Sequence, residues 1–405
     1  MVKYSLPKNW VFYDFRAIFT ELTEAKAAIL SLRELPSQRQ WTDDLQVVQL
    51  KMEVAGTSRI EGADFTEREL DAALREGPDA LFTRSQKQAA SVANAYRWIK
   101  TVPTDRPITD DLICHIHRLI ITGADEDHCP PGKLRTKDEN VTFGTPRHRG
   151  IEGGKPCHEG FLKLCEAVER EFKEHDPLIQ ALALHYHFAA MHPFLDGNGR
   201  TARVLESLMT QRGGLQGTLF IAMSNYYYEE KATYLQTLSN VRAKDHDLTE
   251  FLKFGLKGVA IQCQRLFKEI KVHVAKSLFR DLMYDLFTRM QNPRKRVIAK
   301  RQLELLKLFL EVDVVTLQKL TKDTKKLYST LNSPHKALIR DLNELIELQA
   351  IEAREANGDF EIRVLLDWGT KMTESAFFEK TKNMATSKTH KILCQSEYLP
   401  PVDTF

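Results

Sequence analysis

The sequence predicts a mainly α-helical protein with a small helical and β-hairpin domain at its C-terminal end. Over the first 290 residues, apolar side chains recur at intervals of three and four, which is typical of amphipathic helices. Asn292 to Arg296 (NPRKR) interrupts this pattern, and an Asn357-Gly358 pair follows later between two alternating runs. Such a pair is a strong hairpin signal. Three helices followed by a hairpin is the order of a winged helix-turn-helix domain.

The helices expected in the first part follow one another with short connections. They cover residues 20–35, 45–55, 66–74, 85–99, 109–120, 158–174, 177–191, 202–212, 229–241, 248–267 and 273–290. Thr66 and Glu69 have the spacing of a capping box, and Gly56 is expected to end the second helix. Residues 177–191 are almost all apolar, which predicts a buried central helix. Between Pro130 and Pro156 the pattern predicts a surface loop or β-hairpin.

The expected organisation has four parts. They are a helical N-terminal segment (residues 1–100), a central domain (101–290), a winged-helix domain (291–369) and an extension without clear pattern (370–405). In the third part, helices are expected at 302–310, 314–321 and 334–348, and the hairpin strands at 350–354 and 360–365.

Composition excludes several classes of protein. The net charge of +3 is too small to indicate nucleic-acid binding by itself. The N-terminus has no apolar signal region, and no apolar run reaches the ~18 residues of a membrane helix. Six scattered cysteines without a Cys-x-x-Cys pair suggest reduced thiols rather than zinc ligands. We therefore expect a cytoplasmic protein, or one delivered into a host cell, that does not associate with membranes.

The most informative segment runs from His192 to Arg203 (HPFLDGNGRTAR). A neutral imidazole can accept a proton from a hydroxyl group, and Asp196 offers a hard oxygen ligand for Mg²⁺. Gly197 and Gly199 allow backbone N–H groups to approach an anion closely. Pro193 should end the preceding helix and place His192 in an extended conformation.

Two arginines complete this segment. Arg200 opens the next helix, so that the positive end of the helix faces the same place. Arg203 lies one turn further on the same face, and two guanidinium groups can hold successive phosphates. The pattern predicts one site for a phosphate chain, a metal ion and a proton acceptor.

These twelve residues match the motif H-P-F-x-D-G-N-G-R-x-x-R, and in this the chain resembles Fic-domain proteins. The resemblance implies a Fic-type helical bundle that transfers AMP from ATP to a Ser, Thr or Tyr hydroxyl of a target protein and releases pyrophosphate. It implies that His192 is the base, that Asp196 holds Mg²⁺ and that Arg203 reaches the γ-phosphate. The ATP-binding residues implied are Gly197, Asn198, Gly199, Arg200, Thr201, Ala202, Arg203, Tyr234 and Leu235, together with Glu61. In the Doc branch, which transfers a terminal phosphate, lysine replaces Gly199.

A second segment, residues 57–62 (TSRIEG), resembles the family's inhibitory motif [S/T]-x-x-x-E-[G/N], with Thr57, Glu61 and Gly62 at the matching positions. A carboxylate paired with Arg203 would remove the guanidinium that the γ-phosphate needs. In some family members the equivalent glutamate also positions the water that removes AMP from a modified target. Glu61 is thus expected to be a brake, a hydrolytic residue or both.

Two further regions resemble family features. Residues 132–144 resemble the flap that aligns a target segment by strand addition, with Arg135 at the matching position and an unusually basic Arg147-His148-Arg149 after it. Tyr234 and Leu235 stand where the family often has a Tyr-Tyr pair near the adenine. Residues 226–228 (YYY) either line the same pocket or belong to the core.

Residues 334–348 would be the recognition helix of the winged-helix domain. Thirteen basic and six acidic residues lie between Arg289 and Glu344, a balance compatible with phosphate contacts. However, Asp341, Glu344 and Glu347 crowd this helix, so DNA binding and protein contact both stay open. The rival to the enzyme is a DNA-binding regulator whose Fic domain senses a nucleotide. Self-association as a homodimer and self-modification are also expected from the resemblance.

Overall fold

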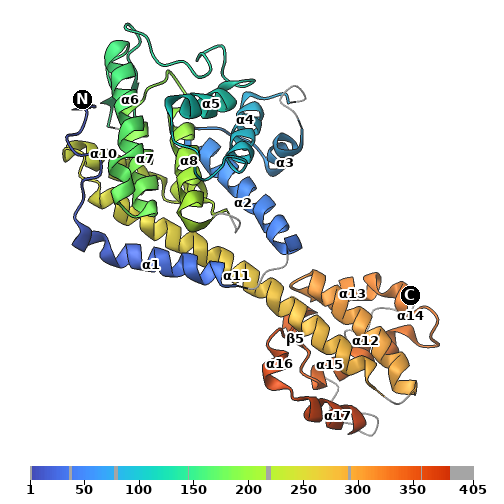
Figure 1. The fold of residues 1–405 in the computed structure, drawn as a ribbon. Coiled ribbons are helices and arrows are strands. Elements are labelled where there is room, and N and C mark those ends of the chain that lie inside the picture. Colours follow the sequence, from blue (N-terminus) through green and yellow to red (C-terminus); the bar gives the residue numbers. More distant parts are fainter. Residues whose placement is uncertain are drawn as a thin grey trace. The chain divides into compact units, whose positions relative to one another are not determined.

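The computed structural model describes residues 2–35, 39–76, 81–144, 146–215, 220–290, 293–356 and 358–383. The chain forms two compact units, Met1–Ile270 and Lys271–Phe405, each of which is described by itself (Figure 1). The division falls inside helix α11 (Thr249–Thr288), ahead of the boundary expected after residue 290. Within the described ranges, no helix combines the length and apolar character needed to cross a membrane.

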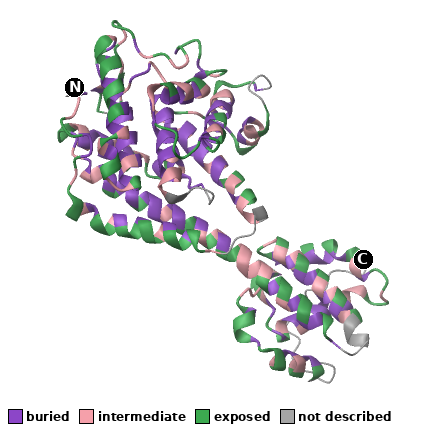
Figure 2. Cartoon of the chain, in the orientation of Figure 1, coloured by how far each residue is buried: buried purple, intermediate pink, exposed green. Residues whose placement is uncertain are grey.

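The first unit is a bundle of helices. They are α1 (Phe15–Arg33), α2 (Arg39–Ile60), α3 (Glu67–Arg75), α4 (Arg84–Ile99), α5 (Asp110–Ile121), α6 (Lys155–Glu169), α7 (Pro177–Met191), α8 (Asn198–Thr210), α9 (Met223–Glu229), α10 (Lys231–Ala243) and the first part of α11. Nearly every residue of α7 is buried, which confirms the expected central helix (Figure 2). Helix α8 packs along α7, so the loop that joins them starts and ends in the core of the unit.

Helix α2 extends further than the sequence suggested. Gly56 was expected to end it, but the helix continues to Ile60, so that expectation is wrong. A Cβ atom at Gly56 would lie 2.5 Å from the backbone of Ser224 in α9, which is closer than any real contact. The lack of a side chain at Gly56 therefore allows α2 to pack closely against α9. Thr57 and Ser58 consequently lie in the last turn of α2, and Glu61 directly follows it.

A small sheet lies at one edge of the first unit. It has the strand order β1 (Val2–Lys3), β3 (His148–Arg149), β2 (Thr142–Phe143). Strand β2 pairs with β3 antiparallel, so the region expected to be a loop or hairpin is a short hairpin. Strand β1 pairs with β3 in parallel and was not expected. In this order β2 is an edge strand of the described sheet.

The second unit combines short helices with a second sheet. Its elements after α11 are α12 (Pro293–Glu311), β4 (Val315–Thr316), α13 (Leu317–Asp323), α14 (Lys325–Tyr328), α15 (Pro334–Glu347), β5 (Ile351–Ala356), β6 (Asp359–Val364), α16 (Trp368–Lys371) and α17 (Glu374–Asn383). The strands are antiparallel in the order β4, β6, β5. At the β5–β6 turn Gly358 has φ +78°, as a tight hairpin requires, and Asn357 lies outside the described residues.

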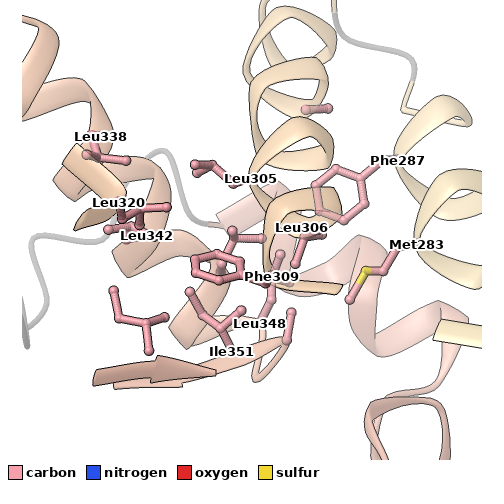
Figure 3. Packing of buried hydrophobic residues seen from close by; sticks show 14 of the residues in the cluster. Met283, Phe287, Leu305, Leu306, Phe309, Leu320, Leu338, Leu342, Leu348 and Ile351 are labelled. Carbon is pink, nitrogen blue, oxygen red and sulfur yellow. The ribbon is translucent and has the colours of Figure 1, made fainter. Parts of the chain in front are cut away.

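Two expectations about this half of the chain are wrong. The helices expected at 248–267 and 273–290 are one continuous helix, α11, because residues 268–272 (KEIKV) contain no glycine or proline to break it. The stretch from Thr370 was expected to lack a pattern, but α17 follows, and its Phe377 is fully buried beside Trp368. Figure 3 shows the core of this unit, to which Phe287, Leu306 and Ile351 belong. Residues 384–405, with Cys394, lie outside the described ranges.

Candidate active site

The site begins where α7 ends. His192 caps the helix in a left-handed conformation with φ 56° and ψ 59°, and its N–H donates to the Phe188 carbonyl at 3.1 Å. The expectation of an extended residue is therefore wrong, although the helix does end here. Pro193 disfavours the right-handed helical conformation for the residue before it, and a left-handed residue is a common way to end a helix.

The hydrogen bonds of His192 define its chemical state. Its Nδ1 lies 2.9 Å from the carbonyl oxygen of Ala189. Because a carbonyl only accepts, Nδ1 carries the proton, and Nε2 keeps its lone pair. Burial lowers the pKa of His192 to about 4, so the ring is neutral at pH 7. Phe143 from β2 stacks on the imidazole with a centroid distance of 3.8 Å. The imidazole therefore has one fixed tautomer, and the lone pair on Nε2 is able to accept a proton.

The loop after His192 turns sharply into α8. Gly197 has φ 74°, and a Cβ atom there would lie 2.9 Å from Ile121 Cδ1. The buried Asn198 side chain accepts from Phe194 N and donates to Phe194 O, both at 2.9 Å. Thr201 donates to the Gly197 carbonyl at 2.9 Å. The Asn198 and Thr201 side chains are thus used to hold the loop, and the N–H groups at the start of α8 remain for an anion.

Asp196 stands at the rim of this loop with 45% of its side chain exposed. Its Oδ1 accepts from Gly197 N at 2.6 Å. Its carbonyl oxygen accepts from Nε2 of His117 at 3.0 Å, and Nδ1 of His117 accepts from Gly132 N at 2.9 Å. Burial lowers the pKa of His117 to about 4, so this second histidine is neutral as well. Sequence reasoning missed His117, whose one visible signal is its place on the apolar face of α5.

No group of three or more His, Cys, Asp or Glu side chains that suits a metal ion occurs in the described part of the chain. Asp196 supplies one carboxylate. Magnesium is commonly bound through one or two carboxylates with substrate phosphates and water. The residues present therefore fit a Mg²⁺ ion that arrives with a nucleotide, and they do not fit a resident metal centre.

Arg200 is held by a carboxylate that the sequence did not reveal. Its Nη1 lies 2.8 Å from Oδ2 of Asp125, whose side chain is fully buried. Asp125 also accepts from Nε of Arg84 at 2.8 Å and from Nε2 of Gln88 at 2.9 Å. Burial is the largest single influence and raises the pKa of Asp125, but the charge of Arg200 and the hydrogen bonds from Arg200, Arg84 and Gln88 together lower the pKa. Asp125 follows α5 and the other two residues lie on α4, and nothing in their local sequence marks them.

Arg203 connects α8 to the C-terminal end of α2. Its Nη2 donates to Oε1 of Glu61, and its Nε donates to Oγ1 of Thr57 at 2.7 Å. The guanidinium is almost entirely buried, while 38% of the Glu61 side chain is exposed. Burial is the largest single influence and raises the pKa of Glu61, but the charge and the hydrogen bond of Arg203, together with the charge of Arg200, lower the pKa overall. The structure thus brings together two residues that are 142 positions apart in the chain.

Gly199 makes this contact sterically feasible. A Cβ atom on Gly199 would lie 2.3 Å from Oε1 of Glu61. The carboxylate therefore rests directly on the first turn of α8, where the backbone N–H groups point. Gly62 follows with φ 91°, which lets the chain leave the end of α2. Ala202 is fully buried behind the turn.

Tyr234 lies behind Arg203. Only 2% of it is exposed, its hydroxyl bonds to His185 Nε2 at 2.8 Å, and it accepts from Arg203 Nη1 at 3.4 Å. Its ring stacks on Tyr227 with a centroid distance of 4.6 Å. In this structure Tyr234 therefore supports the arginine. The neighbouring Leu235 is half-buried. Of the tyrosine run at 226–228, the first two are buried and the third is exposed.

Comparison with known proteins adds a likeness to a family. Residues 107–210, which include the His192–Arg203 segment, match the model of the Fic/DOC family. The chain is similar to protein adenylyltransferase fic-1 of Caenorhabditis elegans, with 33% identity over 165 residues, which is 40% of this chain and 30% of that protein. It is also similar to protein adenylyltransferase Fic of Nematostella vectensis, with 26% identity over 216 residues, 51% of this chain and 40% of that protein. The chain thus spans less than half of these curated relatives.

Two solved structures share the fold. A Fic family protein from Desulfovibrio desulfuricans has a TM-score of 0.55 at 15% identity and covers 89% of this chain and 98% of its own. Fic-1 (residues 134–508) from C. elegans has a TM-score of 0.53 at 20% identity and covers 64% of this chain and 74% of its own.

Proposed function

We propose that the protein is a protein adenylyltransferase held inactive by its own Glu61, since residues 107–210 match the model of the Fic/DOC family. One observation carries the proposal. The free Nε2 of His192, the carboxylate of Asp196 and the guanidinium of Arg203 lie on one loop and one helix turn, and Glu61 pairs with that guanidinium. A base beside an anion-binding helix end is what nucleotidyl transfer to a hydroxyl requires.

The proposed reaction follows from the state of each group. Nε2 of His192 accepts the proton of a Ser, Thr or Tyr hydroxyl of the target, and the oxygen attacks the α-phosphorus of ATP. The bond between the α-phosphorus and the bridging oxygen breaks, and pyrophosphate leaves in line with the attack. Mg²⁺, bound through Asp196 and phosphate oxygens, would neutralise the developing negative charge. The backbone N–H groups at the start of α8, with Arg200 and Arg203, would hold the phosphates.

The proposed inhibition is a competition for Arg203. The γ-phosphate would need the guanidinium that Glu61 occupies, and it would meet a second negative charge above Gly199. Both effects disfavour ATP in a pose suited to in-line attack. We propose in addition that Glu61 can position a water to remove AMP from a modified target, as the resemblance implies.

Strand β2 would receive the target. Val141 O accepts from Gly150 N at 3.2 Å, so residues 141 and 150 form a hydrogen-bonded pair of the β2–β3 ladder. Thr142, the next residue, then points its backbone N–H and C=O away from β3. These groups are available for strand addition by an extended target segment.

The test is incorporation of labelled AMP. The Glu61→Gly variant, incubated with ATP and Mg²⁺ in a cell lysate, should label itself or target proteins far more strongly than the wild type. His192→Ala in the same background is the matched control. Equal labelling of the two variants would end the adenylyltransferase proposal. Loss of AMP from labelled target with the wild type, and not with Glu61→Gly, would support the removal activity.

A second candidate function is supported by the second unit, which we propose to be a winged-helix domain that binds duplex DNA. Asp341 on α15 is fully buried, and its carboxylate pairs with Arg301 Nε at 2.9 Å and with the Tyr328 hydroxyl at 3.0 Å. Glu344 accepts from Gln302 at 2.6 Å. Two of the acidic residues that crowd this helix in the sequence are therefore turned inward, towards α12 and α14.

The outer side of the same region is basic. Its exposed cationic residues are Lys319, Lys322, Lys325, Lys326, Lys336 and Arg340. Duplex binding that weakens steeply with salt, and that is lost when Lys322, Lys325, Lys326 and Lys336 are all replaced by glutamine, would support DNA binding. Lys307→Gln is the control, because that lysine pairs with Glu304 on α12. Duplex binding that does not depend on salt, or the absence of duplex binding, would contradict the DNA-binding proposal.

A further inference from the structure

We propose that this protein selects target segments that are acidic around the acceptor hydroxyl. The feature that carries the proposal is a group of three arginines beside the edge strand β2, Arg147, Arg149 and Arg242, here called the flap arginines. None of the three has a carboxylate within salt-bridge distance among the residues that the structure describes. The proposal rests on the proposed function, since it concerns the target of the same site.

Arg242 lies nearest to the chemistry. Its guanidinium carbon lies over the ring of Phe143, 4.9 Å from the ring centroid, and Phe143 itself stacks on His192. Its Nε donates to the Leu238 carbonyl at 3.3 Å, but Nη1 is buried and has no hydrogen-bond partner. Burial without a carboxylate partner lowers the pKa of Arg242 to about 10. A largely buried guanidinium without a carboxylate partner is unfavourable, and a carboxylate of a bound segment close to it would offset its charge.

Arg149 and Arg147 extend this positive region along the flap. Arg149 stands opposite Thr142 in the β2–β3 register, and Thr142 is the residue whose backbone groups face outwards. The Nε of Arg149 is buried and also lacks a hydrogen-bond partner. Arg147 is exposed in the turn between the two strands. A segment added to β2 would therefore pass close to all three cations.

The acidic residues around the flap do not neutralise these arginines. Glu139 accepts from Thr136 N at 2.6 Å, and Glu152 pairs with Lys3 at 3.2 Å. The other functional arginines of the site behave differently, because Arg200 and Arg203 each have a buried or half-buried carboxylate partner. The arginines beside β2, where the target would bind, have no carboxylate partner, whereas the arginines that would hold the phosphates have one. This difference indicates that the target supplies the anions that pair with the flap arginines.

The experiment uses two synthetic peptides with one threonine in the same β-prone sequence. One peptide carries Asp and Glu on both sides of the threonine, and the other carries Asn and Gln at the same positions. Binding is measured by fluorescence anisotropy on the full-length Glu61→Gly, His192→Ala protein, which needs no turnover. The value of kcat/KM for AMP transfer is measured on Glu61→Gly.

We expect the acidic peptide to bind and react at least about tenfold better, with an advantage that shrinks at high salt. Arg147→Glu should remove much of this preference and improve a basic peptide. This substitution is at an exposed turn and leaves the core intact. Arg170→Glu is the control, because Arg170 pairs with Glu166 on α6, and it should leave the preference unchanged.

Equal binding of the two peptides, or an advantage insensitive to salt, would overturn the inference. So would an Arg147→Glu variant that changes the KM for ATP and leaves peptide preference intact, because the flap arginines would then serve the nucleotide. Acidic preference in binding without AMP transfer would leave the inference standing and refute the adenylyltransferase proposal. AMP transfer to lysate proteins without a preference for the acidic peptide would refute the inference about the target and leave the adenylyltransferase proposal standing.

Discussion

Replacing Glu61 by glycine should change activity and stability in opposite directions. The substitution frees Arg203 for the γ-phosphate and removes a negative charge from the space above Gly199. It also leaves a buried guanidinium without its carboxylate, although the bonds from Arg203 to Thr57 and Tyr234 remain. We therefore expect tighter ATP binding together with a less stable nucleotide-free protein.

The size of both effects follows from the exposure of the pair. A charge-assisted hydrogen bond contributes about 1.5–3 kcal/mol, and the 38% exposure of the Glu61 side chain places this pair at the lower end. About 1.5 kcal/mol corresponds to about a tenfold change in an equilibrium constant. The dissociation constant for ATP with Mg²⁺ should thus fall by about tenfold or more, and the free energy of unfolding should fall by about 1–2 kcal/mol without nucleotide.

The assay combines calorimetric ATP titration with thermal unfolding at several ATP concentrations. Saturating ATP should restore the stability of Glu61→Gly, because a ligand stabilises the folded state that binds it. Glu61→Gln should lie between the two proteins, since a neutral amide still accepts one hydrogen bond from Arg203. If Glu61→Gly binds ATP no better than the wild type and unfolds at the same temperature, the competition for Arg203 does not operate.

Three further predictions concern Gly56, His192 and Glu53. Gly56→Ala should lower the free energy of unfolding by about 1–3 kcal/mol, because the new Cβ meets the Ser224 backbone. The same substitution should raise basal AMP transfer, because it loosens α2. Measurements of stability and of AMP labelling on the same variant check both effects. The rate of Glu61→Gly should stay flat from pH 8 down to about pH 5, because burial lowers the pKa of His192 to about 4 and keeps the base neutral; a fall centred near pH 6.5 would contradict this. Glu53 accepts a hydrogen bond from Ser224 N at 2.7 Å, and burial raises its pKa to about 7. The carboxyl group therefore binds its proton more tightly in the folded than in the unfolded protein, and the free energy of unfolding should fall as pH rises from about 5 to 8. Glu53→Gln should weaken that pH dependence in denaturant titrations by about 2 kcal/mol over this range, and an unchanged slope would show that Glu53 does not titrate there.

The sequence predicted the helical class, the central helix α7 and the hairpin order of the C-terminal unit, because these depend on periodicity and turn residues that act locally. Local signals also failed in identifiable places. Gly56 looked like a helix end but serves close packing on α9, and Phe377 had no visible pattern although it fills the core of its unit. In both cases the deciding contact is made with a residue far away in the chain, Ser224 for Gly56 and Phe287 for Phe377.

By itself the sequence determined which chemical groups are available, because the twelve residues from His192 to Arg203 place a base, a carboxylate, two glycines and two arginines within one loop and one helix turn. The tertiary structure decided what those groups contact. Asp125 holds Arg200, and Glu61, which follows α2 and lies 142 positions before Arg203, holds Arg203. The physical reason is that spacing along the chain sets which side chains share a helix face, whereas ion pairs and burial depend on how separate helices pack.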